Sequence, residues 1–213
     1  TGVKMNNEVI SMSADTAAFD ATGKDYLSGA DSTCPASGNG SAVTTLLELA
    51  KKAGWGTGAV TTTRITHATP AATYAHVCHR DAENTIAAQT VPGGSGYNTA
   101  LGDGVDVLLG GGRQFFLPTA SGGKRTDGRD LTAEFGARGY TYVKNKTEFD
   151  AAPASTTKKL VGLFTNSHMS YDIDRDATVE PSLAEMTTKA IDILSKNQTG
   201  FFLMVEGGRI DHA

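Results

Sequence analysis

Apolar residues follow two periods along this chain, one typical of buried strands and one typical of amphipathic helices. Short apolar or β-branched runs predict strands at 58–64, 105–109, 140–143, 158–164 and 201–208, the last of them fully buried. Helical patterns separate these runs. This alternation favours an α/β fold, a three-layer α/β/α sandwich whose mostly parallel sheet is covered by helices on both faces.

The helical segments carry start and stop signals as well as apolar stripes. A helix is predicted at 41–54, with Ser41 as its N-cap and Gly54 at its end. Its apolar stripe is Val43, Leu46, Leu47, Leu49 and Ala50. Thr-Pro at the start of 69–80 is typical of a helix entry, and 130–139 is a further helical segment.

The clearest helical pattern lies within 181–200. Ser182 and Glu185 have the spacing of a capping box, in which each side chain bonds the other residue's backbone amide. The apolar face of this predicted helix is Leu183, Met186, Ala190, Ile191 and Leu194.

Composition narrows the class of protein without identifying it. The 213 residues are 39% hydrophobic and 20% charged with a net charge of -4, which suits one globular domain spanning 1–213. The charge gives no indication of nucleic-acid binding. No apolar run approaches the ~18 residues of a membrane span, and no signal peptide is evident. Because the chain begins at Thr1 without a Met, we expect a processed protein, an engineered one or a fragment.

The chain has two cysteines, Cys34 and Cys78, which leave two alternatives open. They form one disulfide, which fits an oxidising compartment, or they are two buried thiols. Neither belongs to a C-x-x-C pair, so a thiolate zinc site is not expected.

The segment 205–213, VEGGRIDHA, places carboxylates just after a predicted strand. Ligands in parallel α/β sheets bind beyond the carboxyl ends of strands. A lone buried carboxylate is costly unless it is paired or metal-bound, which makes Glu206 a candidate ligand. Gly207 and Gly208 permit a sharp turn that brings Asp211 back toward Glu206. A solvated turn is the alternative interpretation.

A second candidate segment, 63–81, is rich in polar side chains: His67, Thr69, His76, His79 and Arg80. Thr69 could be only an N-cap, His76 is more typical of a structural residue, and Arg80 could be a surface charge. A helix-borne Arg80 near a carboxylate cluster could instead hold an oxyanion with two parallel hydrogen bonds. The glycines of LGGGR at 109–113 are weak evidence for a phosphate cradle.

Taken together, these segments resemble the alkaline phosphatase family. The resemblance rests on THATPAATYAHV followed by Arg80 and on FFLMVEGGRIDHA. It is supported by TGVK, VDVLLGGGRQFF and PSLAEMTTKAIDILSKNQTGFF, which occur in the family's order and cover nearly the whole chain. The resemblance implies an alkaline-phosphatase-like sandwich that is incomplete in these residues.

The resemblance also implies roles for particular residues. In the family each site holds two zinc ions and one magnesium ion. Thr69 and Glu206 match magnesium ligands, Asp211 matches a ligand of the first zinc, and Arg80 matches the arginine that binds phosphate. His67 and His212 match two positions that vary within the family, and are expected to act beside the metals without binding them directly.

The implied activity is hydrolysis of phosphate monoesters through a phosphoserine intermediate, with small monoesters and inorganic phosphate as ligands. A homodimer and a periplasmic or secreted location are also implied. The family's nucleophilic serine would precede Thr1, and its next zinc-binding histidine would follow Ala213, so we expect these residues alone to be inactive. The sequence ADST at 30–33 does not fit the nucleophile motif. Alternatives are a non-catalytic metal- or phosphate-binding module, or a related metal-dependent phosphodiesterase or sulfatase.

Overall fold

Five parallel strands form one sheet in the order β3-β4-β2-β1-β5 in the computed structural model, which describes residues 1–213. The strands are β1 (Gly56–Arg64), β2 (Val107–Gly111), β3 (Thr141–Val143), β4 (Leu160–Leu163) and β5 (Phe201–Glu206). All five predicted strands are present, and the predicted parallel sheet is confirmed.

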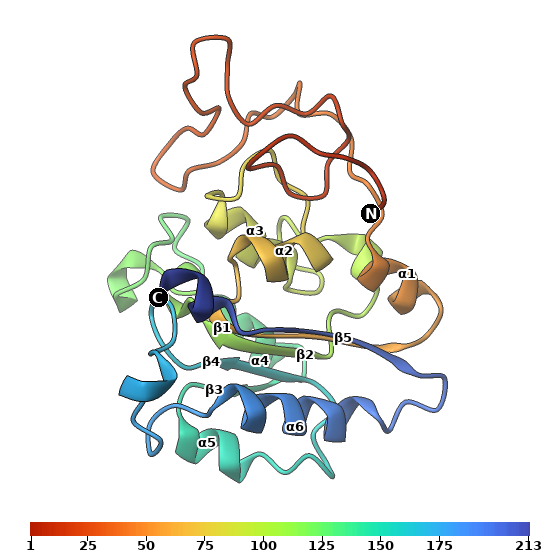
Figure 1. Cartoon of the computed structure of the whole chain (residues 1–213), viewed down its shortest axis with the longest axis vertical. Coiled ribbons are helices and arrows are strands. Elements are labelled where there is room, and N and C mark those ends of the chain that lie inside the picture. The colour runs from red at the N-terminus through yellow and green to blue at the C-terminus, as the bar shows by residue number, and fades with distance from the viewer.

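Helices cover both faces of this sheet. One layer holds α1 (Leu46–Lys52), α2 (Ala68–Tyr74) and α3 (Glu83–Gln89), and the other holds α5 (Lys146–Ala151) and α6 (Leu183–Leu194) (Figure 1). Helix α4 (Leu131–Ala137) shares the core of the first layer. The short helices α3 and α5 are not among the predicted elements. None of the helices is long and apolar enough to cross a membrane.

Alternating strand residues divide the interior into two cores. Leu108 of β2 packs in the core that includes Leu47 and Tyr74, whereas Leu109 packs with Met186 and Ala190 of α6. Successive side chains of a strand point to opposite faces, so a central strand buried on both sides must be apolar throughout. Full burial of each such leucine stabilises the fold by about 1.5–3 kcal/mol.

Helix α6 begins as predicted, with Ser182 and Glu185 in a complete capping box. The predicted apolar face is wrong at one position, because Ile191 is 42% exposed while Ile193 is buried. Ile193 lies three residues after Ala190 and seven after Met186, so it repeats their direction on the helix. Ile191 lies five residues after Met186 and is turned toward solvent.

Helix α1 starts later than the sequence pattern suggests. Its capping box is formed by Thr45 and Glu48, so the prediction that Ser41 caps this helix is wrong. Leu46 and Leu49 are 64% and 52% exposed, which leaves Leu47 and Ala50 as the buried part of the predicted stripe. Gly54 follows the helix with φ 78°, a left-handed conformation that suits glycine at a helix end.

Helix α2 is shorter than the predicted helix at 69–80, which is a further correction. His67 is its N-cap position and Tyr74 its last residue, so Thr69 lies inside the first turn and is not the N-cap. Arg80 is not on a helix. The chain leaves the helix because Val77 forms an antiparallel bridge with Ile10, and because Cys78 is bonded to Cys34.

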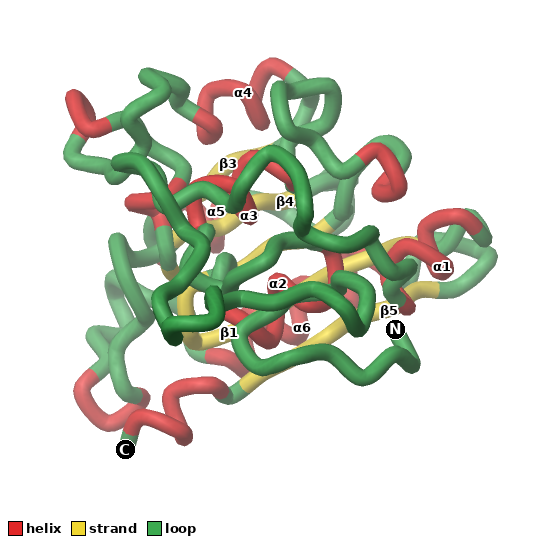
Figure 2. The backbone as a smooth tube through the Cα atoms, turned by 90° about the horizontal axis from the view of Figure 1, so that it is seen from above, coloured by secondary structure: helices red, strands yellow, loops and turns green.

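Residues 1–45 form an irregular segment that lies over the α2 and α3 layer (Figures 1 and 2). A disulfide joins Cys34 to Cys78 across 44 residues, so the bonded alternative is the one found. The segment is also attached by paired backbone hydrogen bonds between Ile10 and Val77, at 3.0 and 3.1 Å.

Strand β5 differs from its prediction as a fully buried strand. It forms one edge of the sheet and pairs only with β1. Its residues are half-buried, and Val205 is 43% exposed. A continuous apolar run is typical of a strand with neighbours on both sides, and β5 has the run without the second neighbour.

A buried ion pair links α1 to the segment after α2. His76 Nε2 lies 2.6 Å from a Glu48 carboxylate oxygen, and its Nδ1 lies 2.7 Å from the carbonyl of Ser11. Burial disfavours both charges, but hydrogen bonds from His76 and Asn98 hold the pKa of Glu48 below its usual value. Hydrogen bonds to Glu48 and Ser11 likewise outweigh burial and raise the pKa of His76.

We expect His76→Gln to lower the free energy of unfolding by about 1–3 kcal/mol at pH 6, and by less at pH 9. A raised histidine pKa gives stability that is complete below the unfolded pKa of about 6.5 and is lost as pH rises through the folded pKa. Urea unfolding of wild type and variant at both pH values measures this difference. An equal loss at both would contradict the charged pair.

The disulfide should contribute substantially to stability, because it closes a loop between residues 44 apart. Replacing both Cys34 and Cys78 by Ser is expected to cost about 2–4 kcal/mol, or about 4–16 °C in melting temperature. Thermal unfolding with and without reductant tests it. Reductant should destabilise wild type and leave the double variant unchanged.

Candidate functional site

The turn after β5 holds Glu206 against β1. Thr61 Oγ1 donates to Glu206 Oε2 at 2.6 Å, and Thr63 Oγ1 lies 3.2 Å from the same oxygen. Gly208 permits this approach, since a Cβ there would lie 2.4 Å from the Thr63 methyl group. No cationic side chain pairs with Glu206, and its carboxylate is held by two hydroxyl groups.

Three histidines gather at the carboxyl end of the sheet. They are His67 before α2, His168 in the loop after β4, and His212 in the 3-10 helix η5 (Gly208–His212). One ring nitrogen of each lies within 4.8 Å of one from each of the others. The rings are steeply inclined, at 81°, 83° and 65° for the three pairs, so they meet edge to face.

The loop that carries His168 is fixed across the ends of two strands. The amide of Gly112 donates to the carbonyl of Ser167 at 2.8 Å, and the amide of Met169 donates to the carbonyl of Thr62 at 3.0 Å. A Cβ at Gly111 would lie 2.1 Å from the Ser167 oxygen. The glycines of LGGGR therefore let this loop pack closely on β2.

His168 is the site residue that sequence reasoning missed. The signal available was its position, five residues beyond the last residue of β4, at the carboxyl end of the sheet where ligands of parallel α/β sheets bind. Nothing local distinguishes it, because a single histidine in a polar loop is ordinary. Arg64 and Arg209, which contact the cluster, were missed for the same reason.

Each histidine of the cluster is in contact with one guanidinium group. Arg80 contacts His67 Nε2 at 2.9 Å, Arg64 contacts His168 Nε2 at 2.6 Å, and Arg209 contacts His212 Nδ1 at 2.8 Å. Arginine has donors and no acceptors, so each contacted nitrogen must present its lone pair.

The surroundings of His67 and His168 favour neutral imidazoles. Burial, followed by the charges of Arg80 and Arg64, lowers the pKa of His67 to about 4. Burial and the charge of Arg64 lower the pKa of His168 to about 3. Both rings are therefore uncharged at neutral pH and can accept hydrogen bonds or bind cations.

Arg80 is anchored by the N-terminal segment. Its backbone amide donates to the carbonyl of Glu8 at 2.7 Å, and its Nε lies 3.7 Å from the Glu8 carboxylate. Cys78, two residues earlier, is fixed by the disulfide. Arg64, by contrast, is bound to Glu83 through Nε and Nη2, both at 2.8 Å.

The structure brings some of the predicted site residues into contact and leaves others open. His67 contacts Arg80 and lies beside His212. Thr69 and Asp211 are both exposed, and their side chains make no hydrogen bond or ion pair. Their placement on α2 and η5 nonetheless puts them on the two elements that carry His67 and His212.

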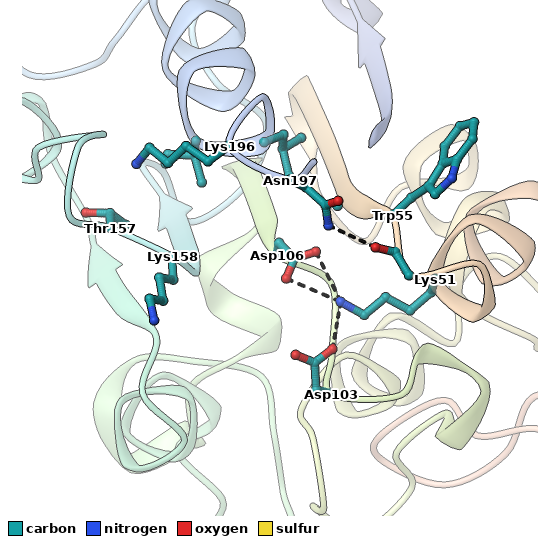
Figure 3. Close-up of a pocket in the computed structure, with 12 residues that line it drawn as sticks. Lys51, Trp55, Asp103, Asp106, Thr157, Lys158, Lys196 and Asn197 are labelled. Atoms are coloured by element: carbon teal, nitrogen blue, oxygen red, sulfur yellow. Dashed lines mark hydrogen bonds and ion pairs between the residues drawn. The ribbon is translucent and has the colours of Figure 1, made fainter. Parts of the chain in front are cut away.

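A separate cavity of about 420 Å³ lies at the opposite, amino end of the strands (Figure 3). Lys51 contacts both Asp103 and Asp106, as does Lys159, so these charges neutralise one another. Although burial opposes it, hydrogen bonds from the two lysines hold the pKa of Asp103 below its usual value. We interpret this network as structural, since it links α1 to the starts of β2 and β4.

Comparison with known proteins identifies the family of this chain. The chain matches the alkaline phosphatase family over residues 1–213. It belongs to the alkaline phosphatase family. The membrane-bound alkaline phosphatase of Bombyx mori is 41% identical over 198 residues, which cover 80% of this chain and 35% of that protein.

Solved alkaline phosphatases share the fold. The Thermus thermophilus enzyme superposes with a TM-score of 0.70 at 33% identity, covering 96% of this chain and 41% of that one. A histidine-to-aspartate mutant of the alkaline phosphatase from the Antarctic bacterium TAB5 gives 0.71 at 27% identity, covering 99% and 48%. That mutant is described with Mg bound in its M3 site. The chain thus spans less than half the length of these alkaline phosphatases.

Proposed function

We propose that this chain forms part of an alkaline phosphatase centre that hydrolyses phosphate monoesters through a phosphoserine intermediate. The observation that carries the proposal is the position of Arg80, held by Glu8 at the edge of the histidine cluster. Family membership supports the reaction class. A homodimer and a periplasmic or secreted location belong to the same proposal, and the disulfide is consistent with an oxidising compartment.

The residues present fit the metal ions that this function requires. Glu206 and Thr69 offer the hard oxygen ligands that magnesium prefers, and Asp211 offers a carboxylate that suits zinc. Neither carboxylate is neutralised by a lysine or arginine. Two zinc ions and one magnesium ion, when bound, would stabilise the attacking and leaving oxygens and lower the pKa of water.

The chain's own residues bind and orient the phosphate. The guanidinium of Arg80 can donate two parallel hydrogen bonds to phosphate oxygens, which fixes both their position and their orientation. Without an anion, one N–H group of Arg80 donates to the lone pair of His67 Nε2. Thr61 and Thr63 keep Glu206 oriented through their hydroxyl groups.

The 213-residue chain alone should bind inorganic phosphate and should not hydrolyse phosphate monoesters. None of its serines matches the nucleophile of the family. We therefore expect no hydrolysis of p-nitrophenyl phosphate with added Zn²⁺ and Mg²⁺, measured by release of p-nitrophenol. Turnover near the ordinary enzyme value of about 10 per second would contradict this assignment of the nucleophile.

Replacing Arg80 tests the proposed phosphate site directly. Arg80→Ala should weaken inorganic phosphate binding about 10- to 100-fold in calorimetry, because a charge-assisted pair contributes about 1.5–3 kcal/mol. Arg80→Lys should bind with intermediate affinity, since an ammonium keeps the charge and loses the paired geometry.

Arg138→Ala is the matched control, because Arg138 pairs with Glu134 on α4, away from the cluster. Equal phosphate affinity in Arg80→Ala and Arg138→Ala would reject the proposed site. Binding that depends on Arg80 without turnover would favour a non-catalytic phosphate-binding module for these residues by themselves.

A further inference from the structure

The three histidines form a constellation that the proposed function does not use as ligands. They come from three segments at the carboxyl end of the sheet, and one ring nitrogen of each lies within 4.8 Å of one from each of the others. We propose that His67, His168 and His212 bind a transition-metal ion directly, and that this binding releases Arg80 to hold an anion. This ligand set contains no carboxylate and includes His168.

The donor chemistry selects the kind of metal. Neutral imidazole nitrogens suit zinc, cobalt, nickel and copper, whereas magnesium and calcium prefer oxygen. Zinc–nitrogen bonds of about 2.0–2.1 Å in a tetrahedral site place ligand nitrogens roughly 3.3 Å apart. Side-chain rotations can reach this from the present separation, because His212 is exposed and the other two rings are only half-buried.

The contacts between arginines and histidines couple metal binding to the release of the arginines. A neutral imidazole has a single nitrogen lone pair, and the other nitrogen carries a proton. In the metal-free site the lone pairs of His67, His168 and His212 accept from Arg80, Arg64 and Arg209 in turn. Whichever nitrogen the metal takes, the ring has no lone pair left for a guanidinium. Metal binding therefore ends all three contacts.

The displaced arginines differ in whether a carboxylate already compensates their charge. Arg64 remains bound to Glu83 through two nitrogens, so its charge is already compensated. Arg80 is 3.7 Å from its carboxylate partner, and the Nε of Arg209 is buried without a partner. A divalent ion beside these charges makes the site strongly electropositive, which an anion such as phosphate relieves.

Metal and phosphate should therefore strengthen each other's binding, and thermodynamic linkage makes the two effects equal. This coupling rests on the proposed role of Arg80, whereas the metal site itself does not. The two parts can consequently fail separately.

The first experiment measures metal binding to the 213-residue chain. Co²⁺ absorption in the visible range and Zn²⁺ calorimetry should each report one ion bound, and Mg²⁺ should not compete. His168→Ala should weaken binding at least 10-fold, while His168→Asp, which restores a ligand atom, should stay close to wild type. His76→Gln is the matched control, since His76 is bound to Glu48 away from the cluster.

Asp211→Asn separates this site from the zinc ligand of the proposed function. Unchanged affinity in Asp211→Asn together with loss in His168→Ala supports the histidine site. Loss in Asp211→Asn with unchanged affinity in His168→Ala overturns it, because the ion then binds the carboxylate. Circular dichroism of each variant confirms that the fold is retained.

The second experiment repeats the Co²⁺ titration with and without inorganic phosphate. Phosphate should raise the Co²⁺ affinity at least fivefold in wild type and leave it unchanged in Arg80→Ala, which still binds the metal. An equal rise in both proteins, or none in wild type, overturns the release of Arg80. If phosphate binds equally well to Arg80→Ala and Co²⁺ binding still requires His168, the proposed function is rejected. The proposed metal site is then still supported.

Discussion

The parallel register between β1 and β5 is the constraint on which the site depends. It pairs Thr61 with Glu206, so the carboxylate leaves the sheet beside two threonine hydroxyls. The same strand, β1, ends at Arg64, which contacts His168, and leads directly into His67. A shift of one residue would turn every side chain of β5 to the opposite face and separate these groups. Backbone pairing thus positions the chemistry.

Much of the fold follows from the sequence because strand and helix periods are local properties. All five strands and the capping box of α6 could be predicted this way. The errors arose where distant parts of the chain decide the outcome. Val77 leaves the helical pattern to pair with Ile10, and β5 lacks the second neighbour that its apolar run suggests. Neither the pairing of Val77 nor the edge position of β5 can be predicted from a short stretch of sequence.

Some residues of the candidate site could likewise be predicted from local sequence, and others could not. Glu206, Asp211 and Arg80 lie in motifs specific enough to indicate a family, whereas His168 becomes visible only when the loop after β4 folds across β2. That loop packs there because Gly111 has no side chain. The result is a cluster in which each of three guanidinium groups contacts one imidazole nitrogen. An ion or anion that took the place of these contacts would have to compensate for their loss.

Strand β5 also has a consequence for how the protein behaves in solution. Its outer edge presents backbone amides and carbonyls that no other strand takes up, next to the exposed side chains of Val205 and Ile210. An unpaired apolar edge of this kind is a template for strand addition. Two copies meeting there would extend the sheet from one molecule into the next, through the six residues of backbone that end at Glu206.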